Sequence, residues 1–483
     1  MDRRQTCRRE RSEVLLLQGS ILLILIVRLW LMATQPLTDL TEARYGELVR
    51  VTCEGGHWLM PHITPTEPFL AKPPLATWLA ACSWSVLGHN EFSLRLPSFL
   101  ASLAAAGMLL AVSSDFGVGR VGRWMMAAML ASSPVWIVCA GSVMTDAVQM
   151  AVVTAAMVTA WKAVENPDVA TWRRLFWGSV GIATLSKGLA TLALIGLPLA
   201  AYVVIGEGPG GLRRSLWDPL GVLLAAGITL AWYVPAELAY PGFLKYFLIG
   251  EHFQRFVQPD WNGDRFGHAH RVPWGTIWLF WGAATCFWLP VMFQEGWRRF
   301  RSPAPIWTRR SEVWLWCWVL APLIFFTVAP NILWTYTLTA VPPFALIVGR
   351  WSETTFHWGR RATPAMLLAS VCLVATLCFA WAPSRIESRS ARELVRIASA
   401  QNPGKPLCFS GCFRYSGSFY TGGQARHERT AEELDEAMRE PGLLMITATG
   451  RARDQIESGR ARIVAERPTA VLLEATPPRY ASR

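Results

Sequence analysis

Residues Val14–Ala33 read VLLLQGSILLILIVRLWLMA, an apolar run as long as the roughly 20 residues that a helix needs to cross a bilayer. The run follows a cluster of five basic residues: Arg3, Arg4, Arg8, Arg9 and Arg11. A signal peptide has a shorter apolar core and a small-residue cleavage site, so we interpret the run as an uncleaved first span. It predicts a membrane protein with a cytoplasmic N-terminus.

The composition agrees with a membrane protein. Of 483 residues, 52% are hydrophobic and 17% are charged, against about 25% charged in an average soluble chain. The net charge of +12 would suit nucleic acid, but most basic residues lie in short clusters between apolar runs, as topology signals do. We therefore expect membrane lipids around the chain and no nucleic-acid partner.

Ten more apolar runs follow the first, which makes eleven predicted spans. They lie near 97–114, 122–140, 144–161, 175–186, 188–205, 219–236, 274–293, 313–329, 332–349 and 363–382. The basic clusters fall in cytoplasmic loops only if 175–205 forms two short spans that turn at Ser186-Lys187-Gly188. This topology places 34–96, 237–273 and the C-terminal tail outside, and predicts a multi-pass protein of the cytoplasmic (inner) membrane.

The tail differs from the rest of the chain. From Ser384 it turns polar and alternates helix-like with strand-like stretches. We predict a mainly α, polytopic transmembrane domain over 1–383, with about 11 helices and outer loops 34–96 and 237–273. A small soluble α/β domain is predicted over 384–483, on the extracytoplasmic side.

The first outer loop carries the charges that most suggest chemistry. Glu42 and Arg44 lie in a helix-like stretch, and Ala71-Lys72-Pro73-Pro74 follows. The two prolines fix an extended approach to the next helix and hold the ammonium in one place. A point-like cation just outside the bilayer suits a lipid-linked phosphate. The alternatives are an amphipathic surface helix and a lysine that anchors a helix end.

Two ionisable residues interrupt later apolar runs. Asp146 lies at the outer end of the fourth predicted span, and Lys187 lies in the predicted turn. Ionisable groups at membrane depth are functional candidates by default, although Asp146 could equally cap a helix. The charge of Lys187 would be costly there without an anionic partner.

The third outer loop supplies Glu251-His252 and Arg255, which shares a helix face with Glu251. Glu251, His252, His268 and His270 match no specific metal-ligand spacing. We therefore predict no metal site and no required cofactor, with a divalent metal as the alternative.

In order and spacing, these segments resemble the lipid-linked-sugar transferases that include the lipid A aminoarabinose transferases and the protein O-mannosyltransferases. The resemblance runs through Thr41–Arg50, His57–Pro61, Phe69–Leu75, Gly88–Pro97, Val143–Asp146, Ser186–Gly188, Glu251–Phe256 and Phe325–Tyr336. It implies a C-type glycosyltransferase fold and a polyprenyl-phosphate sugar donor. It also implies an envelope acceptor, which would be lipid A, another glycan or a protein.

The resemblance also assigns roles. It implies that Glu42 and Asp146 are catalytic. The donor phosphate would be held by Lys72, Arg44, Lys187, Arg255 and Arg271, and the substrates contacted by Tyr45, Glu251, His252 and Tyr336. The chain departs from the family twice. Thr41 stands where many relatives have an aspartate, so that acid is missing or replaced by Asp39, and Ala71 replaces the acid that often precedes the Lys-Pro pair.

Two other classes of function stay open on sequence alone. A transporter or flippase of lipid-linked sugars would use the same kind of cavity, but such proteins often show related halves, and no half-repeat is visible here. A non-catalytic binder is the other alternative, because Thr41 replaces an acid.

Overall fold

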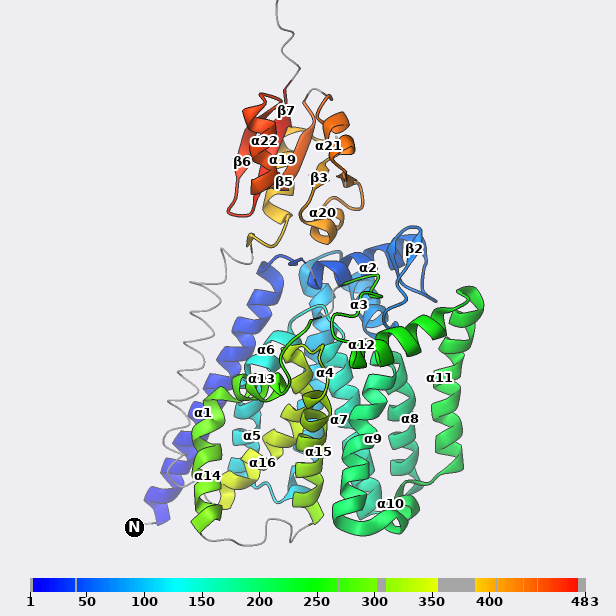
Figure 1. Cartoon of the computed structure of the whole chain (residues 1–483). Helices are drawn as coiled ribbons and strands as arrows, with labels where there is room; N and C mark the ends of the chain where they lie inside the picture. Colours follow the sequence, from blue (N-terminus) through cyan, green and yellow to red (C-terminus); the bar gives the residue numbers. More distant parts are fainter. Residues whose placement is uncertain are drawn as a thin grey trace, which may run out of the picture.

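The computed structural model describes residues 3–39, 41–267, 270–301, 310–354, 387–404, 406–428, 430–440 and 442–476. Long helices form a bundle, and a small domain with a β-sheet stands at one end of it (Figure 1). The N-terminal end of the chain lies at the opposite end of the bundle, the end that also holds α10 (Gly208–Leu216) on the other side of the view.

The bundle follows the apolar runs of the sequence. Its helices are α1 (Arg3–Thr34), α4 (Glu91–Val112), α5 (Arg120–Ser132), α6 (Pro134–Ala140), α7 (Asp146–Glu165), α8 (Ala170–Lys187), α9 (Leu189–Tyr202), α11 (Pro219–Ala239), α13 (Thr276–Ala284), α14 (Leu289–Arg301), α15 (Arg310–Thr327) and α16 (Val341–Thr354). Each predicted span up to 349 coincides with helix, whereas 363–382 lies outside the described residues.

Within the described ranges, four helices are long and apolar enough to cross a membrane unaided: α1, α4, α7 and α11. The number rises to six if α5 with α6, bent by 71°, and α13 with α14, bent by 74°, each count as one span. The chain is a multi-pass membrane protein. The predicted total of about 11 helices across the membrane stays a prediction.

The predicted break between the fifth and sixth spans is present. Helix α8 ends at Lys187, Gly188 has φ +69°, and α9 starts at Leu189. A Cβ at Gly188 would lie 2.6 Å from the ring of Phe247, so a side chain here would be strained in its backbone and would clash. This turn leaves Lys187 at the end of α8 that points toward the outer loops.

The segments predicted as outer loops form a layer across that end of the bundle. It contains α2 (Glu42–Gly55), the hairpin strands β1 (His62–Thr64) and β2 (Glu67–Pro68), α3 (Leu75–Leu87), η3 (Lys245–Gln254) and α12 (Arg255–Val257). Buried apolar side chains hold the layer together, among them Leu37, Tyr45, Leu48, Phe69 and Trp84. Helix α2 lies between the bundle and the C-terminal domain (Figure 1).

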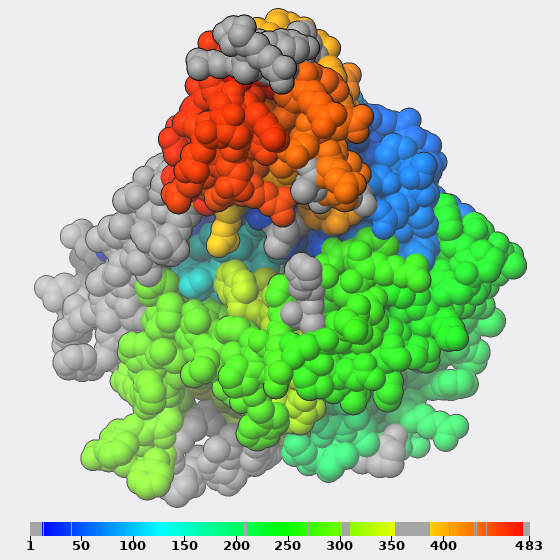
Figure 2. All heavy atoms as spheres, turned by 45° about the horizontal axis from the view of Figure 1, so that its top comes forward, coloured from blue at the N-terminus to red at the C-terminus, as the bar shows by residue number. Residues whose placement is uncertain are grey.

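The C-terminal domain contains a five-stranded sheet in the order β4-β3-β5-β7-β6. Its strands are β3 (Cys408–Ser410), β4 (Arg426–Glu428), β5 (Leu444–Ala448), β6 (Ala461–Glu466) and β7 (Ala470–Ala475); its helices are α19 (Arg392–Gln401), α20 (Arg414–Tyr420), α21 (Ala431–Ala437) and α22 (Thr449–Glu457). Strand β3 pairs in parallel with β4 and β5, whereas β7 runs antiparallel to β5 and β6. Figure 2 shows this domain, in red and orange, beside the blue residues of the first predicted outer loop. The green residues of the middle of the chain lie in front and are not covered by the domain.

Candidate active site

A cavity of about 480 Å³ lies between the outer loops and the bundle, within the usual size range of small-molecule sites. Apolar side chains from α9 and α15, such as Leu194 and Phe325, line one part of it. The charged residues that line it in the described part of the chain are Arg44, Lys72, Asp146, Lys187, Glu251, Arg255 and Asp264. Four cations and three carboxylates therefore face one chamber.

Lys187 and Asp146 form a buried ion pair in this cavity. The Lys187 Nζ lies 3.0 Å from Asp146 Oδ1, with side-chain exposures of 11% and 10%. The same ammonium lies 5.2 Å from the ring centroid of Tyr336, within range of a cation–π interaction. Asp146 is thus the anionic partner that was predicted for Lys187 because a buried charge is costly without one.

A second group of charges joins Lys72 to the third outer loop. The Glu251 Oε2 lies 3.0 Å from Lys72 Nζ and 3.2 Å from an Arg255 nitrogen. Arg255 also pairs with Asp264 at 2.9 Å, and Tyr246 donates its hydroxyl to Glu251 Oε1 at 3.0 Å. One fully buried carboxylate therefore serves two cations.

The pKa values of Glu251 and Lys72 both lie below their usual values, for different reasons. Burial alone would raise the pKa of Glu251, but the charges of Lys72 and Arg255 outweigh it and the pKa lies below its usual value. Burial lowers the pKa of Lys72, and Glu251 offsets only part of this effect. At neutral pH the group contains an ionised Glu251.

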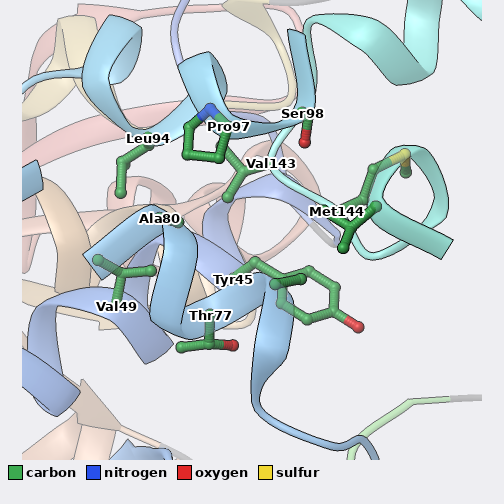
Figure 3. Close-up of a pocket in the computed structure, with 11 residues that line it drawn as sticks. Tyr45, Val49, Thr77, Ala80, Leu94, Pro97, Ser98, Val143 and Met144 are labelled. Carbon is green, nitrogen blue, oxygen red and sulfur yellow. The ribbon is translucent and has the colours of Figure 1, made fainter. Parts of the chain in front are cut away.

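Arg44 and Tyr45 reach the cavity from the first turn of α2. Arg44 donates to the Phe266 carbonyl and lies 5.7 Å from the Tyr45 ring centroid. Beside the cavity, Tyr45 also borders a small apolar hollow between α2, α3 and α4. In Figure 3 the Tyr45 hydroxyl points away from Leu94 and Ala80 in that hollow, so packed apolar side chains fix the ring while its polar end is directed elsewhere.

His252 lines the cavity but is held by main-chain groups. Its Nδ1 lies 2.8 Å from the Phe247 carbonyl oxygen and its Nε2 lies 3.1 Å from the Lys187 carbonyl oxygen. Burial lowers its pKa, so at neutral pH one N–H serves one of these acceptors at a time. His252 therefore ties η3 to the end of α8 and helps to place Lys187.

Several polar atoms of the cavity wall have no hydrogen-bond partner among the described residues. They include Asn331 Oδ1, Thr335 Oγ1, Thr339 Oγ1 and Arg44 Nε. Buried polar groups are nearly always satisfied, so unsatisfied ones in a cavity point to a ligand. Three of these four are oxygen atoms, which suit a ligand rich in hydroxyl groups.

The structure places Glu42 beside the cavity wall, and its predicted catalytic role stays a prediction. Its carboxylate accepts bonds from Arg95 Nε at 3.1 Å, from another Arg95 nitrogen at 2.9 Å and from the Val143 amide at 3.1 Å. Glu42 is absent from the cavity wall. Because three donors already hold its oxygens, the geometry favours a supporting position over the predicted catalytic one.

Arg271, predicted to hold the donor phosphate, lies away from the other predicted site residues. It pairs with Asp260 at 2.7 Å and its side chain is 65% exposed, outside the wall of the main cavity. The other residues predicted for the phosphate or the substrates do line the cavity: Arg44, Tyr45, Lys72, Lys187, Glu251, His252, Arg255 and Tyr336.

Asp264 lines the cavity, although no sequence pattern predicted it as a site residue. It follows Arg255 by nine residues across an irregular loop, where no periodic spacing predicts a contact. Its pairing with Arg255 and its acceptance of the Phe266 amide at 3.0 Å fix the loop that closes on Arg44. In the part of the chain that the structure describes, no group of three or more His, Cys, Asp or Glu residues is arranged to hold a metal.

Comparisons with known proteins agree with this architecture. The sequence model of the dolichyl-phosphate-mannose-protein mannosyltransferase family matches residues 71–236. The undecaprenyl phosphate-alpha-4-amino-4-deoxy-L-arabinose arabinosyl transferase of Pectobacterium carotovorum is 25% identical over 69% of this chain and 59% of its own length. The Enterobacter transferase of the same name is 28% identical over 64% and 54%.

The chain spans about 59% of the length of the first of these curated relatives. Among solved structures, ArnT from Cupriavidus metallidurans bound to undecaprenyl phosphate superposes with a TM-score of 0.72 at 18% identity, covering 94% of this chain and 97% of that one. This match shows the fold. The chain therefore has a C-type glycosyltransferase fold and is similar in sequence to the aminoarabinose transferases and, over residues 71–236, to the protein mannosyltransferase family.

Proposed function

We propose that this protein is a membrane glycosyltransferase that moves a sugar from a polyprenyl-phosphate donor to an envelope acceptor, which is lipid A, another glycan or a protein. One observation carries the proposal. Four cations, three carboxylates and unsatisfied polar oxygens line one cavity whose wall also contains many apolar side chains. Such a chamber accommodates a phosphate, a sugar and the start of a lipid chain together.

The chemistry follows from the charges. As the bond between the anomeric carbon and phosphate breaks, the carbon becomes oxocarbenium-like and negative charge grows on the leaving phosphate. Preorganised cations stabilise that charge in a site with little water. Lys72, Arg255 and Arg44 are the candidates to hold the phosphate, by analogy with the lipid phosphate named in the related structure.

Asp146 is the proposed general base. Its carboxylate is paired with one cation, Lys187, whereas Glu251 is shared by two cations and a tyrosine. A base on the face opposite the leaving group gives inversion at the anomeric carbon. Because Thr41 stands where many relatives have an aspartate, Asp146 carries more of the proposed role here. Aminoarabinose is not assigned as the sugar, since Thr64–Glu67 and Pro330-Asn331 differ from the aminoarabinose branch.

The site is proposed to face the extracytoplasmic side of the inner membrane. Arg213 and Arg214 end α10, which lies at the end of the bundle opposite the C-terminal domain (Figure 1). Basic residues mark the cytoplasmic side of a membrane protein. This orientation would put the C-terminal domain and the cavity outside.

The test uses purified protein in lipid vesicles, a radiolabelled polyprenyl-phosphate sugar and an envelope extract. Asp146→Asn should lower the transfer rate about 10²–10⁴-fold, the usual contribution of a general base. Asp115→Asn is the matched control. Asp115 pairs with Lys162 at 2.5 Å, and neither residue lines the cavity. Movement of the lipid-linked sugar across the bilayer without transfer would support a transporter, and retention without either would support a binder.

A further inference from the structure

The edge of the C-terminal sheet where β3 and β5 end faces the outer layer of the membrane domain. The chain leaves β3 toward β4 on one side, whereas β5 leads toward β6 on the other side. Open α/β sheets bind ligands at such a point, beyond the carboxyl ends of strands whose connections diverge. In this protein, a side chain of the membrane domain reaches this position.

That side chain is Asp39, from the segment between α1 and α2. Its carboxylate accepts the backbone N–H of Tyr415 at 3.1 Å and of Ser416 at 3.2 Å, and the Ser416 hydroxyl. The Asp39 N–H donates to the Arg389 carbonyl at 2.8 Å. Because Tyr415 and Ser416 open α20 just after β3, a residue of the membrane domain caps a helix of the C-terminal domain.

The far end of α20 is bound to the same segment. The Tyr420 hydroxyl accepts the Leu37 N–H at 2.7 Å and donates to Glu91 at 3.0 Å. Glu91 also pairs with Arg392 at 3.1 Å, and Arg392 donates to the Thr34 carbonyl at 2.8 Å. The C-terminal domain therefore holds residues 34–39 at several points, immediately before α2 begins.

Helix α2 separates this contact from the cavity. On one side, a Cβ at Gly46 would lie 2.6 Å from Leu37 and 3.5 Å from Phe419 of α20. From the first turn of the same helix, Arg44 and Tyr45 line the cavity. A shift of α2 relative to α20 would therefore move two residues of the site.

We propose that the C-terminal domain positions Arg44 and Tyr45 in the cavity, with Asp39 and Tyr420 as its positioning residues. The proposal rests on the proposed function, since it assigns these residues to the same site. Neither residue touches the cavity; both act through the start of α2.

The experiment uses full-length protein in lipid nanodiscs, with two readouts: hydrogen exchange of the α2 amides and the kinetics of sugar transfer. Asp39→Ala removes every acceptor of the cap, whereas Asp39→Asn keeps one side-chain oxygen. We expect about tenfold faster exchange across 42–48 and about tenfold higher KM for the donor in Asp39→Ala, with kcat changed less, and partial rescue in Asp39→Asn. Tyr420→Phe, which leaves the Leu37 N–H unsatisfied, should change both readouts in the same direction.

Two matched controls should leave both readouts at wild-type values. Asp435→Asn breaks a surface pair with Arg460 in the same domain, and Tyr240→Phe removes a hydroxyl that lies 3.5 Å from His62 Nε2. Unchanged α2 exchange and donor KM in both folded Asp39→Ala and Tyr420→Phe would overturn the proposal. A wild-type protein that transfers no sugar would refute the proposed function instead, while the exchange data would still show whether the domain holds α2.

Discussion

Replacing Glu42 by Gln separates a supporting role from a catalytic one. Arg95 is 2% exposed and donates to both oxygens of Glu42 and to the carbonyls of Met32, Gln35 and Pro36. Glu42→Gln leaves that guanidinium buried with neutral acceptors alone. The Val143 amide, three residues before Asp146, also loses a charged acceptor.

The expected size of the effect follows from these partners. Breaking a buried ion pair on one side costs about 3–5 kcal/mol. Here the new amide oxygen still accepts one bond and three carbonyl oxygens remain, so we expect about 2–3 kcal/mol of lost unfolding free energy. Since Asp146 keeps its own lysine, transfer should fall by only about tenfold, which corresponds to roughly 1.4 kcal/mol.

The assay is a double-mutant cycle with Glu42→Gln, Arg95→Met and the pair, unfolded by sodium dodecyl sulfate in mixed micelles. A coupling energy of about 2 kcal/mol is expected between the two positions. Glu67→Gln in the β1–β2 hairpin is the control for loss of a carboxylate in the outer layer. Glu42→Gln protein with wild-type stability and no detectable transfer would refute the reasoning and return Glu42 to the reaction itself.

Three further predictions concern the cavity. Burial lowers the pKa of Lys72, so its positive charge is lost as pH rises through a value below the usual lysine pKa of about 10.4. The KM for the donor should therefore rise over that alkaline range in the wild type but not in Lys72→Arg. The same pH profile in both proteins would contradict this. Arg255→Ala should raise the donor KM about 10–100-fold, the loss of a charged hydrogen bond, whereas Arg271→Ala should leave it unchanged; equal effects in the two variants would restore Arg271 to the phosphate site. Transfer measured after exhaustive treatment with a chelator should match untreated protein, and activity restored only by a divalent ion would show a metal requirement.

The arrangement of the membrane domain could be predicted because apolar length and basic clusters are local signals. Each predicted span in the described chain is largely helical. The break at Gly188 follows from the basic clusters, which fall in cytoplasmic loops only if 175–205 turns there. The bends were not predicted. Periodicity continues through Ser133 and Thr285, whereas the helix axes there turn by 71° and 74°.

The site could be predicted by residue type and in its local pair, Glu251 with Arg255, but not in its long-range pairs. Lys187 called for an anion, and Asp146 provides it. Nothing in the sequence showed that Glu42 would meet Arg95, 53 residues away, or that Asp39 would cap a helix 376 residues later. Such pairs depend on how α1, α2 and α4 meet, which no spacing along the chain encodes.

The shared Glu251 has a consequence for turnover. A polyprenyl phosphate left after transfer would have to leave two cations, and long-lived product would block the next cycle. Glu251 is already bonded to both cations, Lys72 and Arg255, so its carboxylate competes with the phosphate for them. Its competition would speed departure of the spent lipid at some expense of affinity, so Glu251→Gln protein should hold polyprenyl phosphate longer, as dissociation kinetics would show.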